Sequence, residues 1–100
     1  MPAKPPPPAR MEPRAVGRRL KALREMNDLS ASDCWRALNL QASAWSAYET
    51  GGRALPAITA AAISEFFGVT LDYIYLGDRR ALPFDLARKL ERGEPKKPDA

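Results

Sequence analysis

The sequence has no histidine, and Cys34 is the one cysteine among its 100 residues. It therefore lacks the side chain that most often transfers protons near neutral pH and most often binds zinc. A single cysteine excludes an internal disulfide and a site built from several thiolates, a pattern typical of a reducing cytosol. There is also no phosphate-binding glycine loop, so we expect neither an enzyme nor a metal or other cofactor.

Long apolar runs are absent as well. No stretch approaches the roughly 20 apolar residues that a membrane span needs. The opening residues MPAKPPPPAR lack the apolar segment of a signal peptide. We therefore expect a soluble, cytoplasmic protein that does not bind a membrane.

Apolar residues are also scarce at both ends of the chain. Six prolines fall within residues 1–14, and residues 93–100 read GEPKKPDA. We expect both segments to be disordered, the first as a basic, proline-rich arm. A single folded domain then occupies residues 15–78, and a helical extension follows over residues 79–92.

The charged residues are unevenly distributed. Residues 1–24 hold seven Lys and Arg against one Glu, a net charge of +6. Residues 25–78 hold two basic and seven acidic residues, a net charge of −5, and residues 79–100 carry +3. If the partner is nucleic acid, its phosphates must be neutralised mainly from the two ends of the chain. The alternative is an ordinary solvated surface with scattered charge.

Apolar residues recur at the three- and four-residue spacing of amphipathic helices. Glycine, proline and capping residues lie between these segments. Ser30 and Asp33 form an S-x-x-D capping signal, and Asn39 suits a tight turn. Together these patterns predict an all-α fold, a compact bundle of five to six short helices. The expected helices span residues 15–27, 30–38, 42–49, 56–67, 71–75 and 83–90. The expected core residues are Leu20, Leu23, Leu38, Leu40, Trp45, Tyr48, Ile58, Phe66 and Ile74.

Three segments carry a resemblance to a known family. They read GRRLKALR, LSASDCWRALNLQASAWSAYETGGRALP and FFGVTLDYIYLGD, and their order and spacing are similar to those of lambda-repressor-like, or XRE-type, helix-turn-helix regulators of bacteria and phages. The resemblance covers about residues 16–78. It implies a sequence-specific, repressor-like transcriptional regulator that binds double-stranded DNA in the bacterial nucleoid as a homodimer. The third helix would then enter the major groove.

The resemblance also implies roles for individual residues. Arg24 and Glu49 are expected to form a largely buried ion pair that ties the first helix to the third. Facing the bases we expect Gln41, Ala42, Ser43, Ser46, Ala47 and Thr50. Facing the phosphates we expect Ser30, Ala31, Arg18, Arg19, Lys21 and Arg53, with Arg10 and Arg14 adding positive charge and the arm reaching toward the minor groove.

The sequence departs from the family pattern at several positions. The base-facing set has no Arg or Lys, so we expect modest direct readout and a larger contribution from groove shape and phosphate contacts. Trp35 stands where the family usually has alanine, so its ring either repacks the core or turns outward toward another protein chain. Cys34, at a position that is usually leucine, is expected to be a buried, unreactive thiol.

A second class of function competes with DNA binding. A helix-turn-helix fold can also serve as a protein-binding adaptor or antitoxin-like module, with Trp35 or the C-terminal helix contacting the partner. The acidic central segment and the small residues of the third helix favour this reading. The basic ends of the chain favour DNA.

Overall fold

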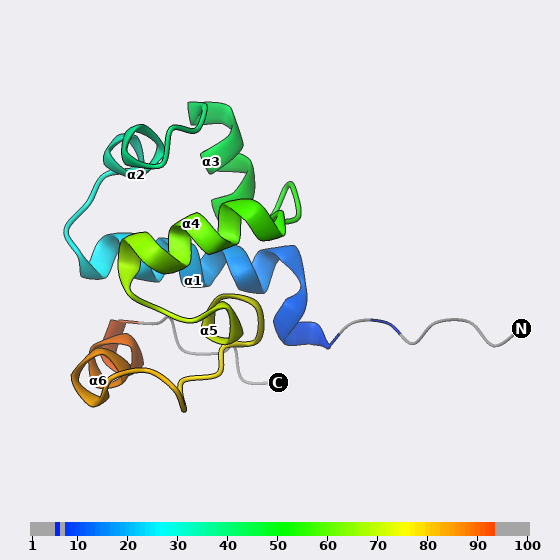
Figure 1. Ribbon diagram of the computed structural model, residues 1–100. Helices are drawn as coiled ribbons and strands as arrows, with labels where there is room; N and C mark the ends of the chain where they lie inside the picture. Colours follow the sequence, from blue (N-terminus) through cyan, green and yellow to red (C-terminus); the bar gives the residue numbers. More distant parts are fainter. Residues whose placement is uncertain (1–5, 7, 94–100) are drawn as a thin grey trace, which may run out of the picture.

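In the computed structural model, which describes residue 6 and residues 8–93, all regular secondary structure is helical (Figure 1). The expected compact all-α fold is confirmed. The elements are the 3-10 turn η1 (Ala9–Met11) and the helices α1 (Pro13–Met26), α2 (Ala31–Ala37), α3 (Ala42–Thr50), α4 (Ala57–Phe67), α5 (Leu71–Leu76) and α6 (Phe84–Gly93).

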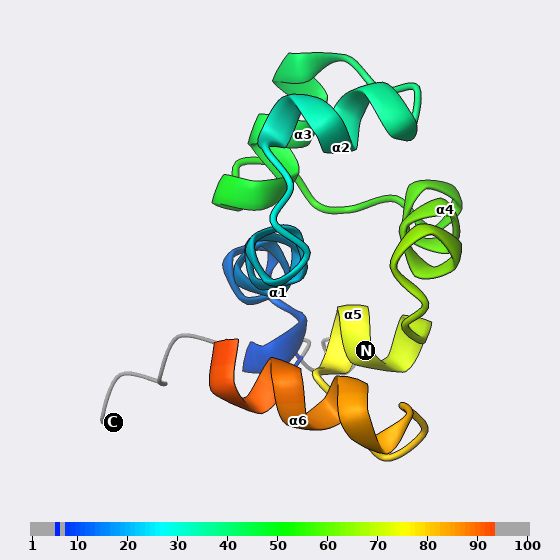
Figure 2. The same ribbon diagram turned by 90° about the vertical axis from the view of Figure 1, so that its left-hand side faces the viewer.

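Helix α1 lies at the centre of the bundle. Its apolar residues Val16, Leu20 and Leu23 are buried, the two leucines completely. In both views, α2 and α3 lie on one side of α1, whereas α5 and α6 lie on the other (Figure 1, Figure 2). The two ends of the molecule are therefore connected through the packing of α1.

Helices α1 and α3 approach each other closely at Gly17. A Cβ atom placed on Gly17 would lie 2.3 Å from the backbone oxygen of Glu49 and 2.7 Å from that of Tyr48. Both distances are far shorter than a non-bonded contact, and the backbone of a packed helix cannot move aside as the end of a flexible side chain can. Only glycine fits here, because it has no Cβ atom.

A short turn connects α2 to α3. Ser30 begins α2 through a capping box, in which its hydroxyl accepts from the Asp33 N–H and its own N–H donates to the Asp33 carboxylate. Asn39 ends the helix with φ 56°, the left-handed conformation that asparagine tolerates. The Leu40 N–H donates to the Trp35 carbonyl across this turn, at 2.8 Å. The sequence predicted both the capping box and the turn at Asn39.

Helix α4 buries a different face from the one predicted. Ile58 is 87% exposed and Phe66 is 43% exposed, so their assignment to the core is wrong. The buried residues are Ala60 and Ile63, with Phe67 packed against the core. The sequence AITAAAISEFF is apolar almost all round the helix, and a pattern without a polar face cannot indicate which side turns inward.

The other predicted core positions are buried to different extents. Leu20, Leu23, Trp45, Tyr48 and Ile74 lie in the core, whereas Leu38 and Leu40 are half-buried and pack against it.

The chain becomes helical earlier than predicted. The disordered arm was expected to extend to residue 14, but residues 9–11 form η1 and α1 begins at Pro13, a residue suited to the first turn of a helix. The expectations for residues 1–5, 7 and 94–100 lie outside the described residues.

Helix α6 packs against α1. Leu90 is completely buried, and Leu82, just before the helix, is 8% exposed. Phe84, at the start of α6, is 72% exposed, and the Arg88 guanidinium lies 5.6 Å from its ring. Through Leu90, the segment after Asp78 is part of the folded core.

We predict that Gly17→Ala destabilises the protein, because the added methyl group would force α1 and α3 apart. Overpacking of this kind typically costs about 1–3 kcal/mol and outweighs the roughly 1 kcal/mol by which alanine favours a helix. Because the clash is with backbone atoms, we expect a cost near the top of this range and a net loss of up to about 2 kcal/mol in the free energy of unfolding, measured by urea denaturation.

Gly52→Ala is the matched control, since the nearest heavy atom to a Cβ there lies 3.7 Å away and the residue does not have a positive φ. This variant should unfold within about 0.5 kcal/mol of the parent. If Gly17→Ala is as stable as the control, the two helices do not approach each other as closely at Gly17 as the structure shows.

Candidate nucleic-acid interface

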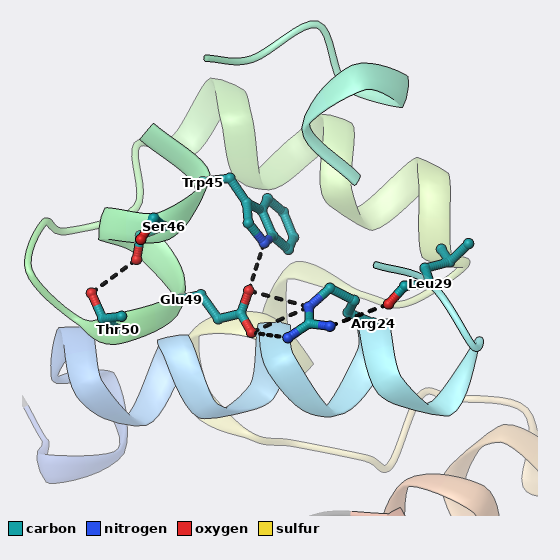
Figure 3. A network of polar contacts seen from close by, with 6 residues as sticks. All are labelled: Arg24, Leu29, Trp45, Ser46, Glu49 and Thr50. Atoms are coloured by element: carbon teal, nitrogen blue, oxygen red, sulfur yellow. Dashed lines mark hydrogen bonds and ion pairs between the residues drawn. The ribbon is translucent and has the colours of Figure 1, made fainter. Parts of the chain in front are cut away.

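The outer face of α3 is exposed and carries small side chains. Gln41, Ala42, Ser43, Ser46 and Thr50 are exposed, and Ala47 is half-buried. The Thr50 hydroxyl donates to the Ser46 carbonyl at 2.8 Å, so it already has a partner within the helix (Figure 3). The structure thus places all six residues predicted to face the bases on one accessible surface, without a charged group among them.

The inner face of α3 is fixed by a polar network (Figure 3). Arg24 Nη2 lies 2.5 Å from Glu49 Oε1, and Arg24 Nε lies 3.2 Å from each carboxylate oxygen. Trp45 Nε1 donates to Glu49 Oε2 at 2.6 Å, and Arg24 Nη1 donates to the Leu29 carbonyl at 3.2 Å. One carboxylate therefore binds both α1 and the indole of its own helix.

This ion pair is largely withdrawn from water. The side chains of Arg24 and Glu49 are 18% and 11% exposed. The hydrogen bonds that Arg24 donates to Glu49 raise the pKa of Arg24, so the guanidinium remains charged. The resemblance led us to expect this pair. The hydrogen bond from Trp45 to Glu49 was not predicted, although the two residues are four apart on one helix and can therefore meet.

A hollow of about 650 Å³ opens beside the network. Helices α1, α2 and α3 all contribute to its walls, and its lining includes part of the outer face of α3. The lining residues are Arg18, Lys21, Arg24, Ala31, Trp35, Ala42, Trp45, Ser46, Glu49 and Thr50. The outer face of α3 and the exposed side of α1 therefore meet at one concave surface.

Of the predicted phosphate ligands, Arg18 and Lys21 line this hollow and are exposed. Arg19 does not. Its Nη1 donates to the carbonyls of Arg10, at 2.7 Å, and Ile74, at 3.0 Å, and burial lowers the pKa of its guanidinium. Neighbouring residues on a helix point about 100° apart, so Arg19 turns toward α5 and fastens it to α1. Its assignment to phosphate contact is not compatible with this position.

The remaining phosphate candidates differ in availability. The capping box occupies both the hydroxyl and the backbone N–H of Ser30. Those hydrogen bonds lower the pKa of Asp33, which therefore holds a negative charge at the start of α2. Ala31 is exposed on the wall of the hollow, and Arg53 is exposed with its guanidinium 5.9 Å from the Tyr48 ring. Ser30 itself is a weaker candidate than the sequence suggested.

The two unusual residues of α2 lie in different environments. Cys34 is completely buried, and burial raises the pKa of its thiol, so the reactive thiolate is disfavoured. Trp35 is half-buried: part of its ring packs against the core, and part lines the hollow. The Arg36 guanidinium lies 5.2 Å from the centre of the Trp35 ring. The ring thus packs against the core and is also partly exposed, and its contact with another protein chain stays a prediction.

Among residue 6 and residues 8–93, no group of three acidic, cysteine or histidine side chains is arranged to hold a metal ion. No helix in the same part of the chain has the length and apolar character needed to cross a membrane.

The arrangement of α1, α2 and α3, with a short turn between two crossing helices and an exposed outer face on the second of these, defines a helix-turn-helix domain. The family described as "Helix-turn-helix domain" matches residues 15–73, more than half of the chain, and the chain belongs to this family. Neither the curated proteins nor the solved structures gave a match to the chain. DNA is the partner that such a domain implies.

We predict that Arg24→Ala and Glu49→Ala each lower the free energy of unfolding by about 2–4 kcal/mol, because each leaves the other charge without its partner in a mostly buried position. The double variant should lose clearly less than the sum of the two losses. Urea denaturation of all four proteins measures this coupling.

Arg80→Ala is the control, since Arg80 pairs with Asp78 through a side chain that is 91% exposed. It should change stability very little, as exposed pairs generally do. Additive losses for Arg24 and Glu49, each below about 1 kcal/mol, would contradict the role given to the network.

Proposed function

We propose that this protein is a sequence-specific, repressor-like transcriptional regulator of the lambda-repressor-like, or XRE, type. It binds double-stranded DNA with α3 in the major groove. The observation that carries this proposal is the division of α3 into two faces. Trp45, Tyr48 and Glu49 hold the helix rigidly from behind, while its outer face is accessible and free of bulk. The proposal includes a cytoplasmic location, at the bacterial nucleoid, and no catalytic activity.

Small residues on α3 favour recognition by fit. Gln41 is the one long polar side chain among the six, and it can pair with adenine. Alanine methyl groups contact thymine methyl groups, and serine accepts several partners. Since the helix brings no cation, Arg18, Lys21 and Arg53 supply the contacts to phosphates around it. Direct contacts to bases then give modest specificity, and the shape of the groove adds to it.

A homodimer on paired half-sites is part of the proposal, because one small domain contacts few base pairs. Two surfaces are candidates for this contact, the helix after Pro83 and Trp35. Leu90 is completely buried and serves the fold, so Phe84 is the residue of α6 that remains available to a second copy. Trp35 lines the hollow beside α3 and is better placed for the partner that α3 itself contacts.

The second candidate function is a protein-binding adaptor. One specific observation favours it: the outer face of α3 lacks a charged side chain, and Asp33 holds a negative charge at the start of α2, the helix that packs against α3. A basic protein partner would meet such a surface without repulsion.

We predict that Ala42→Glu and Ser43→Glu each abolish binding to duplex DNA. The added carboxylate would face the negative groove, and its bulk would prevent the close approach that small residues permit. Ser43→Ala and Ser46→Ala should each weaken binding by only about 1 kcal/mol, because few strong contacts are available to lose. Anisotropy titrations of a labelled duplex, across salt concentrations, measure these effects.

Ala61→Glu is the matched control, because Ala61 is an exposed alanine on α4, outside the proposed interface. It adds the same charge to a helix and should bind DNA nearly as the parent does. If the parent binds no duplex DNA while circular dichroism shows that it is folded, the adaptor function replaces this proposal.

A further inference from the structure

Trp35 differs from Trp45 in having an unused hydrogen-bond donor. Trp45 is completely buried, and its indole N–H donates to Glu49. Trp35 is half-buried, and its Nε1 has no hydrogen-bond partner among the described residues. It is also not one of the buried polar atoms left unsatisfied, so this N–H reaches solvent. A large apolar ring with a free donor therefore lies on the wall of the hollow.

The charged groups around this ring are mostly positive. Arg18 and Lys21 are three residues apart on α1, so they project from the same side of the helix into the hollow. Both are exposed, and no ion pair involves either of them in the described part of the chain. Arg36 adds a third cation close to the ring. The acid that lines the hollow, Glu49, is already bound by Arg24 and Trp45. The hollow thus offers cations and a donor without a free carboxylate on its lining.

We propose that the hollow holds the sugar–phosphate backbone of the DNA strand that borders the groove entered by α3. Trp35 packs against a deoxyribose, and its indole N–H donates to a phosphate oxygen. Arg18 and Lys21 neutralise phosphates beside it. A sugar–phosphate chain matches this surface because it alternates a sugar, whose C–H groups can pack against an indole ring, with an anion at the spacing of one nucleotide. The inference rests on the proposed DNA binding. It adds a contact by Trp35 of α2 to the DNA backbone, beyond the contacts of α3 with the groove.

The two kinds of contact respond differently to salt. Phosphate neutralisation by Arg18 or Lys21 releases counterions, so removing either side chain should lower the slope of log K against log salt by about one unit. Packing of the uncharged Trp35 ring releases no counterions. Trp35→Ala should therefore weaken binding roughly tenfold at every salt concentration, as is usual for loss of a well-packed aromatic contact, with the slope unchanged. Trp35→Phe, which retains an aromatic ring but has no N–H, should lie between the parent and Trp35→Ala.

Tryptophan fluorescence of the 100-residue chain tests directly whether bound DNA covers Trp35 in the hollow. Adding unlabelled duplex should change the tryptophan emission of the parent, because Trp35 becomes covered. The same addition should leave the emission of Trp35→Phe almost unchanged, because Trp45 is buried in both proteins. Binding itself is measured in parallel by the anisotropy of a labelled duplex. Circular dichroism verifies that each variant is folded.

Two control variants remove similar groups outside the hollow and outside the proposed dimer surfaces. Phe66→Ala removes an exposed aromatic ring from α4, and Arg80→Ala removes an exposed cation that follows α5. Both should bind DNA like the parent and keep its salt slope.

The outcomes separate the two proposals. If duplex DNA binds but Trp35→Ala binds equally well and the emission of the parent does not change, the role of Trp35 is overturned and DNA binding by α3 stands. If no DNA binds to the folded parent, both proposals fail. A change in Trp35 emission caused instead by polyglutamate would then assign the hollow to an acidic protein segment.

Discussion

The contact between α1 and α3 is the constraint on which the rest of this structure depends. Gly17 brings the two helix backbones together, and Arg24 binds Glu49 a short distance along the same interface. Helix α3 has nine residues, too few to be stable alone in water. Its position therefore comes from tertiary contacts. Because α5 and α6 also pack on α1, the same helix that positions α3 organises the opposite end of the molecule.

This constraint explains how a helix with such small outer residues can serve in recognition. The inner residues Trp45, Tyr48 and Glu49 fix the helix, so the outer residues need only leave room for close approach. A rigid helix that fits a groove loses little conformational entropy on binding, which offsets the small number of polar contacts it makes. Because α3 has no positively charged side chain on this face, the positive charge has to come from neighbouring helices. Arg18 and Lys21 of α1 line the hollow beside α3 and supply it.

Much of the fold and part of the site were predictable from the sequence, and the failures have physical causes. The turn at Asn39 and the capping box of Ser30 have local signals, so both were found. Helix α4 has no polar face, and its spacing therefore placed Ile58 and Phe66 in the core when both are exposed. Arg19 was assigned to the DNA side with its neighbours because charge alone carries no direction. Its carbonyl partner in α5 is distant in sequence.

The difference in burial between the two tryptophans follows from whether a hydrogen-bond acceptor lies near each of them in the sequence. A buried indole requires an acceptor for its N–H, since an unsatisfied buried donor is costly. Trp45 has Glu49 four residues later on the same helix, where the carboxylate can reach the ring. Trp35 has no such neighbour, because Ala31 precedes it by four residues and Asn39 follows it in the left-handed turn that ends α2. Without a local acceptor, the Trp35 N–H stays at the surface. Because the Trp35 ring is only half-buried, its indole N–H remains free to donate a hydrogen bond to an anionic partner beside α3.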